Sequence, residues 1–130
     1  MNKNVYPLPK TFSRYDNERV MVYLNEQKVE GYVPDNAPEG TKPISGYTYT
    51  GTEPDGGTLI YAMDESRDEL INGIIRSRYS QTEEDAIKTH QIIALQNPRC
   101  AKSSEYASEW AAFCVERENA IATVDRWLSK

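Results

Sequence analysis

The segment Arg76-Ser77-Arg78-Tyr79-Ser80-Gln81-Thr82-Glu83-Glu84 lies between two segments with helical apolar spacing. Basic residues are typical of the last turn of a helix and acidic residues of the first turn, because the helix macrodipole favours those charges there. Ser80 and Thr82 each offer an N-cap for the second helix. The stretch therefore predicts a joint between two helices.

The segments on either side of this joint carry further helix signals. Ser66-Arg67-Asp68-Glu69 has the pattern of a capping box and predicts the start of a first helix at Arg67. The second helix should end at Asn97, because the residue before Pro98 avoids the α region. Its expected apolar face consists of Ala86, Ile87, His90, Ile93 and Ala94.

A third and longer helix is predicted from Glu105 to Leu128, with Ser103 or Ser104 as its N-cap. At 1.5 Å per residue it would be roughly 36 Å long, whereas the helix before it would reach only about 22 Å. The second helix is therefore too short to cover the whole apolar stripe of the third. The sheet, the first helix or another protein chain must cover the rest of that stripe. That stripe contains Tyr106, Trp110, Phe113, Cys114, Arg117, Ile121, Val124, Trp127 and Leu128.

The N-terminal half predicts strands instead of helices. Residues 1–19 contain Pro7 and Pro9 and suggest an extended arm. Four later segments are rich in β-branched and aromatic residues and are predicted strands of one antiparallel sheet. The turn residues of Gly51–Gly57 predict that the last two of these strands form a hairpin. The four segments are 20–24, 28–33, 47–50 and 58–62.

These patterns together predict an α+β fold in which an N-terminal antiparallel β-sheet precedes three helices. Residues 1–66 should form the arm and the small sheet, and residues 67–130 a helical region that packs on it. A chain of 130 residues fits a single domain.

Charge and composition narrow the choice of partners. The net charge is −5, from 15 basic and 20 acidic side chains, and neither half of the chain is basic. Nucleic-acid affinity requires clustered Lys and Arg, so we expect no nucleic-acid partner. No targeting signal and no apolar run of membrane-spanning length occurs, so we expect a cytoplasmic protein without a membrane partner.

Few residues offer catalytic or metal chemistry. His90 is the only histidine and would be either a general base or, as we favour, a helical residue facing a carboxylate or solvent. The acidic run Glu83–Asp85 is explained by the first turn of a helix, where the macrodipole favours negative charge. Two cysteines, Cys100 and Cys114, are too few for a structural zinc site. We therefore expect no enzymatic activity, no cofactor and no metal.

Two groups of side chains are candidate binding residues. Tyr is unusually frequent, with 9 residues against 2 Phe, and its apolar ring with a polar tip suits interfaces. Tyr47, Tyr49 and Tyr61 lie on expected strands, where they would form either a recognition surface or a core face. Trp110 and Trp127 are the corresponding candidates on the last helix.

Arg76 and Arg78 offer an anion site near the helix joint, with Arg99 as a third contributor. The simpler alternative is that they pair with the acidic first turn of the next helix or complement the C-terminal dipole of their own helix.

Ile75-Arg-Ser-Arg-Tyr-Ser-Gln-Thr-Glu-Glu-Asp-Ala-Ile87, followed by Glu105-Tyr-Ala-Ser-Glu-Trp-Ala-Ala-Phe-Cys-Val-Glu116, resembles the C-terminal part of small phage- or prophage-encoded proteins of gut bacteria. The resemblance covers about 50 residues and implies no catalytic residue. It implies a non-enzymatic structural or assembly protein, cytoplasmic or virion-associated, whose partner is another protein or a second copy of the chain. The alternative is a small-ligand or carbohydrate-binding module on a Tyr-rich sheet face.

Overall fold

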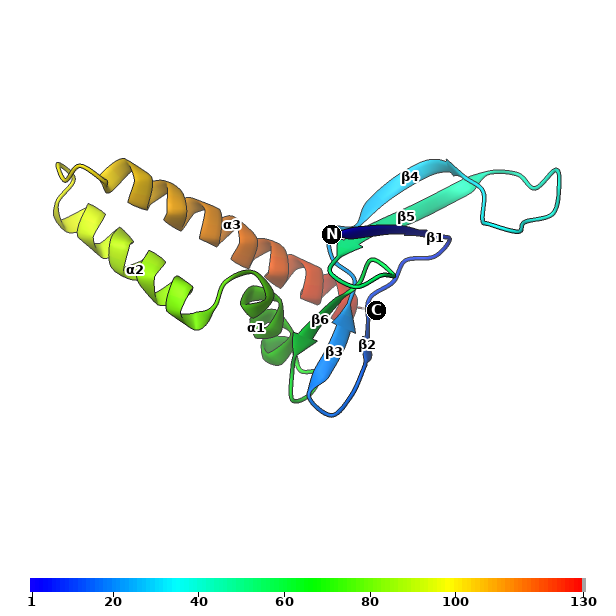
Figure 1. Cartoon of the computed structure of the whole chain (residues 1–130), viewed down its shortest axis with the longest axis horizontal. Coiled ribbons are helices and arrows are strands. Elements are labelled where there is room, and N and C mark those ends of the chain that lie inside the picture. Colours follow the sequence, from blue (N-terminus) through cyan, green and yellow to red (C-terminus); the bar gives the residue numbers. More distant parts are fainter. Residues whose placement is uncertain (130) are drawn as a thin grey trace. The chain divides into compact units, whose positions relative to one another are not determined.

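The computed structural model describes residues 1–129 and confirms the α+β class, with antiparallel strands followed by helices (Figure 1). The chain divides into two compact units, Met1–Met63 and Asp64–Lys130. The first unit contains the strands and the second contains the helices. That the helices pack on the sheet, in one domain, stays a prediction.

Within residues 1–63, all of which the structure describes, six strands form two three-stranded antiparallel sheets, with the orders β1-β5-β4 and β2-β3-β6. Figure 1 shows β5 extending alongside β4 and β1. The strands are β1 (Asn2–Tyr6), β2 (Phe12–Arg14), β3 (Arg19–Val22), β4 (Gln27–Tyr32), β5 (Ile44–Gly51) and β6 (Thr58–Tyr61).

Three expectations about these strands were wrong. The N-terminal arm contains β1 and β2, which are both edge strands, where neighbouring prolines are tolerated. The expected single sheet is two sheets. The expected hairpin of 47–50 with 58–62 does not form, because β5 pairs with β1 and β4 whereas β6 pairs with β3. The Gly51–Gly57 segment instead carries the chain from one sheet to the other.

The two sheets meet around three tyrosine rings. Tyr6 and Tyr49 come from β1 and β5, and Tyr23 follows β3 in the other sheet. The ring of Tyr23 packs edge-on against both, with centroids 6.0 Å from Tyr6 and 5.7 Å from Tyr49. Such pairs each contribute about 0.5–1.5 kcal/mol beyond simple burial. Val20, Val22 and Ile60 are fully or almost fully buried nearby on β3 and β6.

The second unit contains α1 (Arg67–Arg78), α2 (Gln81–Gln96) and α3 (Ser103–Leu128). The hydroxyl of Ser66 accepts a hydrogen bond from the Glu69 amide at 3.4 Å and caps α1. Ser80 and Glu83 form a complete capping box on α2, so Ser80 is the N-cap and Thr82 lies inside the helix. The expected end of α2 at Asn97 is confirmed.

The N-cap expected for α3 was wrong. Lys102 occupies that position and makes no side-chain cap, while Ser103 and Ser104 lie in the helix. The Ser103 hydroxyl instead donates to the backbone oxygen of Pro98 at 2.9 Å, because the tight loop between α2 and α3 brings that carbonyl within reach.

α2 and α3 lie side by side, and α1 contacts the C-terminal half of α3 (Figure 1). Phe113 and Val124 of α3 are buried, as are Leu70 and Ile74 of α1. The apolar face expected for α2 was partly wrong, because Ala86 and Ile93 are exposed whereas the carboxylate-bearing Glu84 is buried.

Candidate functional site

Within residues 1–129 no group of three or more His, Cys, Asp and Glu side chains could hold a metal ion. Over the same residues, none of the helices has both the length and the apolar character needed to cross a bilayer. Cys100 and Cys114 are half-buried free thiols.

His90 lies on α2, faces α3 and is half-buried. Its Nδ1 lies 2.9 Å from Oε2 of Glu109, and its ring stacks on Tyr106 with centroids 4.2 Å apart. Of the two alternatives for His90, the structure shows the carboxylate partner. The contact ties the two helices together near their connecting loop.

Arg76 and Arg78 both have carboxylate partners. Nη2 of Arg76 lies 2.7 Å from Oε1 of Glu84, and Nε of Arg78 lies 3.1 Å from Oε2 of Glu116. Glu84 also accepts from Lys88 at 2.6 Å. Burial raises the pKa of Glu84, but the hydrogen bonds from Lys88 and Arg76 outweigh it and hold that pKa below its ordinary value. An external anion would have to displace these carboxylates.

The three candidate tyrosines lie in different surroundings. Tyr49 is fully buried, and its hydroxyl donates to Glu26 at 2.5 Å and accepts from the Lys10 amide at 2.8 Å. Tyr47, on the same strand, is half-buried. Tyr61 lies in the other sheet and is 70% exposed. The structure thus does not bring them together on one sheet face, and Tyr61 alone presents an open ring.

Asp55 lies beside the tyrosine rings and binds two of their hydroxyl groups. The sequence did not predict this role of Asp55. Its Oδ2 accepts from the Tyr23 hydroxyl at 2.8 Å, and its backbone oxygen accepts from the Tyr6 hydroxyl at 2.5 Å. The ammonium group of Lys10 lies 4.7 Å from the ring centroids of both Tyr6 and Tyr23. Burial raises the pKa of Tyr23, and its hydrogen bond to Asp55 raises it further.

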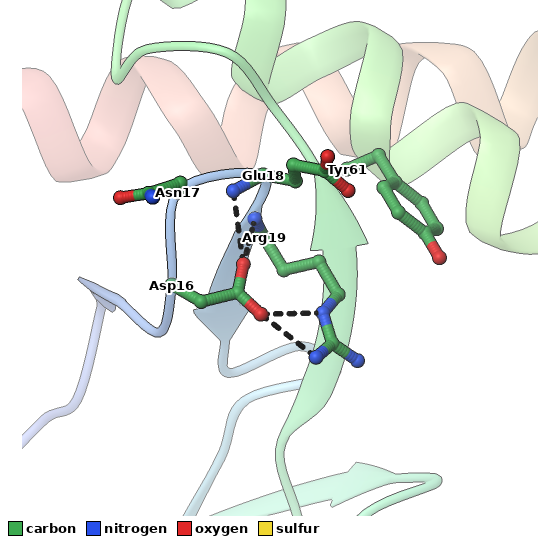
Figure 2. Close-up of a pocket in the computed structure, with 5 residues that line it drawn as sticks. All are labelled: Asp16, Asn17, Glu18, Arg19 and Tyr61. Carbon is green, nitrogen blue, oxygen red and sulfur yellow. Dashed lines mark hydrogen bonds and ion pairs between the residues drawn. The ribbon is translucent and has the colours of Figure 1, made fainter.

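Tyr61 lines an open hollow of about 500 Å³ together with the turn before β3 (Figure 2). The other lining residues are Asp16, Asn17, Glu18 and Arg19. Arg19 and Tyr61 are directly paired in the β3–β6 register, so their side chains stand on the same face of that sheet.

Asp16 fixes the shape of this hollow. Its Oδ1 accepts from the amides of Glu18 at 2.9 Å and Arg19 at 2.7 Å, and its Oδ2 accepts from the Arg19 guanidinium (Figure 2). The hydrogen bond from the Arg19 side chain is the chief reason that the pKa of Asp16 lies below its ordinary value. An Asp followed by a short turn is a detectable local signal, but Tyr61, which is paired with Arg19 between β3 and β6, is distant in sequence.

The helical unit exposes apolar side chains at the C-terminal end of α2. Ile92, Ile93 and Leu95, here called the α2 patch, are 55%, 40% and 70% exposed. Trp110 is half-buried and packs against Phe113, and Trp127 is buried. Neither of these two candidate binding residues therefore presents a fully exposed ring. Sequence analysis missed Ile92 and Leu95 because they lie outside the stripe assigned to that helix.

No protein-family model, no curated protein sequence and no solved structure matches this chain.

Proposed function

We propose that this chain is a non-enzymatic assembly protein whose copies associate through the α2 patch. The observation that carries the proposal is the exposure of Ile92, Ile93 and Leu95 within one helical turn. Contiguous apolar surface of this kind, set among polar residues, is characteristic of interaction sites.

The geometry of the helical unit favours a second copy of the chain as the partner. The side-chain contacts of α1 and its C-cap Tyr79 with α3 lie between Phe113 and Asp125, whereas the part of α3 near its start is paired with α2. That end of the unit is a two-helix layer, which leaves one face of each helix without a helical neighbour among the described residues. Two such layers from two copies would complete a four-helix bundle.

A symmetric pairing would place each α2 patch against the same patch of the other copy, as in an isologous interface. The sequence resemblance to small phage- or prophage-encoded proteins favours an assembly role, which would be performed by binding other protein subunits. The acidic net charge of −5 likewise favours a protein partner over nucleic acid.

The test compares the double variant Ile92→Gln/Leu95→Gln with the wild-type chain by sedimentation equilibrium. We expect the wild type to form dimers in a concentration-dependent way and the variant to remain monomeric. Gln is nearly as good a helix former as Leu, so α2 should persist, and circular dichroism checks this.

The matched control is Val33→Gln/Ile44→Gln, which removes two apolar side chains of 44% and 43% exposure from the strand-containing unit. It should dimerise like the wild type. A folded wild type that stays monomeric at high concentration would refute the proposal, and so would a dimer unaffected by the α2 patch substitutions.

A further inference from the structure

We propose that the hollow formed by residues 16–19 and Tyr61 is a binding site for a neutral carbohydrate. This site belongs to the strand-containing unit and is independent of the α2 patch. Its volume of about 500 Å³ falls within the usual range of small-molecule sites, roughly 300–1,000 Å³.

The first step is the aromatic platform. Tyr61 ends β6 and is 70% exposed, although a Tyr on a three-stranded sheet could bury its ring. Tyr presents a broad apolar face with a hydroxyl at its rim. The C–H groups on one face of a pyranose ring can pack on such a surface while the hydroxyls at the sugar's edge stay free to form hydrogen bonds.

The second step is the fixed guanidinium beside this ring. Asp16 binds Arg19 through Nε at 2.9 Å and Nη2 at 2.7 Å, and the Tyr15 ring lies 5.1 Å from its central carbon. No hydrogen bond or ion pair engages Nη1 within residues 1–129, and this nitrogen points away from Asp16 (Figure 2). A donor held in place before binding loses little conformational freedom when a ligand arrives.

The third step is the balance of donors and acceptors. Arg19 offers donors, Glu18 offers carboxylate acceptors, and Asn17 and the Tyr61 hydroxyl offer both. A sugar hydroxyl is also both donor and acceptor, so neighbouring hydroxyls can satisfy this mixture. Phosphate offers mainly acceptors, so it matches this mixture less well.

Charge selects a neutral sugar over an anion. Asp16 neutralises Arg19 through their ion pair, and the carboxylate of Glu18 leaves the lining with a net charge of −1. An incoming anion would face this charge, which opposes it. A neutral polyol carries no such penalty.

The experiment follows the backbone amide resonances of the full chain during titration with neutral trisaccharides (cellotriose, maltotriose, chitotriose and mannotriose). Trigalacturonate and inorganic phosphate are the anionic probes. We expect at least one neutral trisaccharide to shift the amides of residues 16–19 and 61, and both anionic probes to bind more weakly.

Three variants locate the site. Tyr61→Ala should weaken binding about tenfold or more, because it removes the aromatic platform. Glu18→Gln removes the net negative charge of the lining and should reduce the preference for neutral trisaccharides over trigalacturonate. Leu8→Ala removes an exposed apolar side chain elsewhere in the same unit and should change nothing. The amide spectra show whether each variant is folded.

The proposal is overturned if no neutral trisaccharide binds, or if phosphate or trigalacturonate binds more tightly than every neutral sugar. It is also overturned if a folded Tyr61→Ala variant binds with wild-type affinity.

Discussion

Asp55 shows how one side chain can connect two sheets. Its Oδ1 accepts from the Gly57 amide at 2.9 Å, while its Oδ2 and its backbone oxygen hold the hydroxyls of Tyr23 and Tyr6. Burial raises the pKa of Asp55, but the hydrogen bonds from Gly57 and Tyr23 and the charge of Lys10 outweigh it and lower that pKa overall. The residue therefore stays ionised at neutral pH and stabilises the joint between the sheets.

The turn around Asp55 could be predicted from sequence, but its role could not. Asp followed by two glycines is a local turn signal. Tyr23 and Tyr6 lie 32 and 49 residues away along the chain, and no local pattern indicates that they converge on it. The same holds for the hollow, where Arg19 meets Tyr61 only through strand pairing.

The substitution Asp55→Asn tests this role. We expect it to lower the free energy of unfolding by about 1–3 kcal/mol, because the Tyr23 hydroxyl loses a charged acceptor in partly buried surroundings. Urea unfolding followed by circular dichroism measures the change. The exposed Asp35→Asn is the matched control and should change stability by less than about 0.5 kcal/mol. Equal stability of the two variants would show that the Asp55 contacts contribute nothing.

At the scale of elements, helices were easier to predict than sheets. The signals at Ser66, Ser80 and Asn97 act on residues within four positions, so the sequence contains them in full. Strand pairing depends on distant segments, and β1 joins a strand more than forty residues away. The α3 cap was wrong although the competing acceptor is local: the Ser103 hydroxyl donates to the carbonyl of Pro98, five residues earlier in the connecting loop.

The joint between α1 and α2 gives a prediction about pH. Glu84 accepts from both Arg76 and Lys88, and its folded pKa lies below its ordinary value of 4.5. A lowered carboxyl pKa contributes stability that is complete above the unfolded pKa and is lost as the pH falls through the folded pKa. Glu84→Gln should therefore cost about 2 kcal/mol at pH 7 and progressively less below pH ~4.5.

Chemical unfolding at a series of pH values from about 6 to 3 measures this effect. The free energy of unfolding of the variant should fall less steeply than that of the wild type as the solution is acidified. Glu118→Gln changes a carboxylate whose side chain is 72% exposed and should leave the wild-type slope intact. Parallel curves for wild type and Glu84→Gln would contradict the predicted contribution.

At the scale of the whole molecule, the two units differ in how their contacts are spaced along the chain. The strand-containing unit depends on pairings such as that of Asn2 with Gly51, which close long loops. In the helical unit each helix is held by hydrogen bonds between residues four apart, and the consecutive helices α2 and α3 pair across a short loop, although Arg67 of α1 also reaches Asp125 of α3. Local contacts form quickly and require little loop closure, which favours independent folding of the helices.

This difference predicts that residues 64–130, expressed alone, keep a helical circular dichroism spectrum and unfold cooperatively on heating. The buried side chains of Leu70, Ile74, Phe113 and Val124 supply the expected core. Phe113→Ala in the same fragment should abolish or sharply weaken the transition, since such a change in a core costs about 3–5 kcal/mol. A fragment without helical signal would show instead that the helices fold only in the presence of the strand-containing unit.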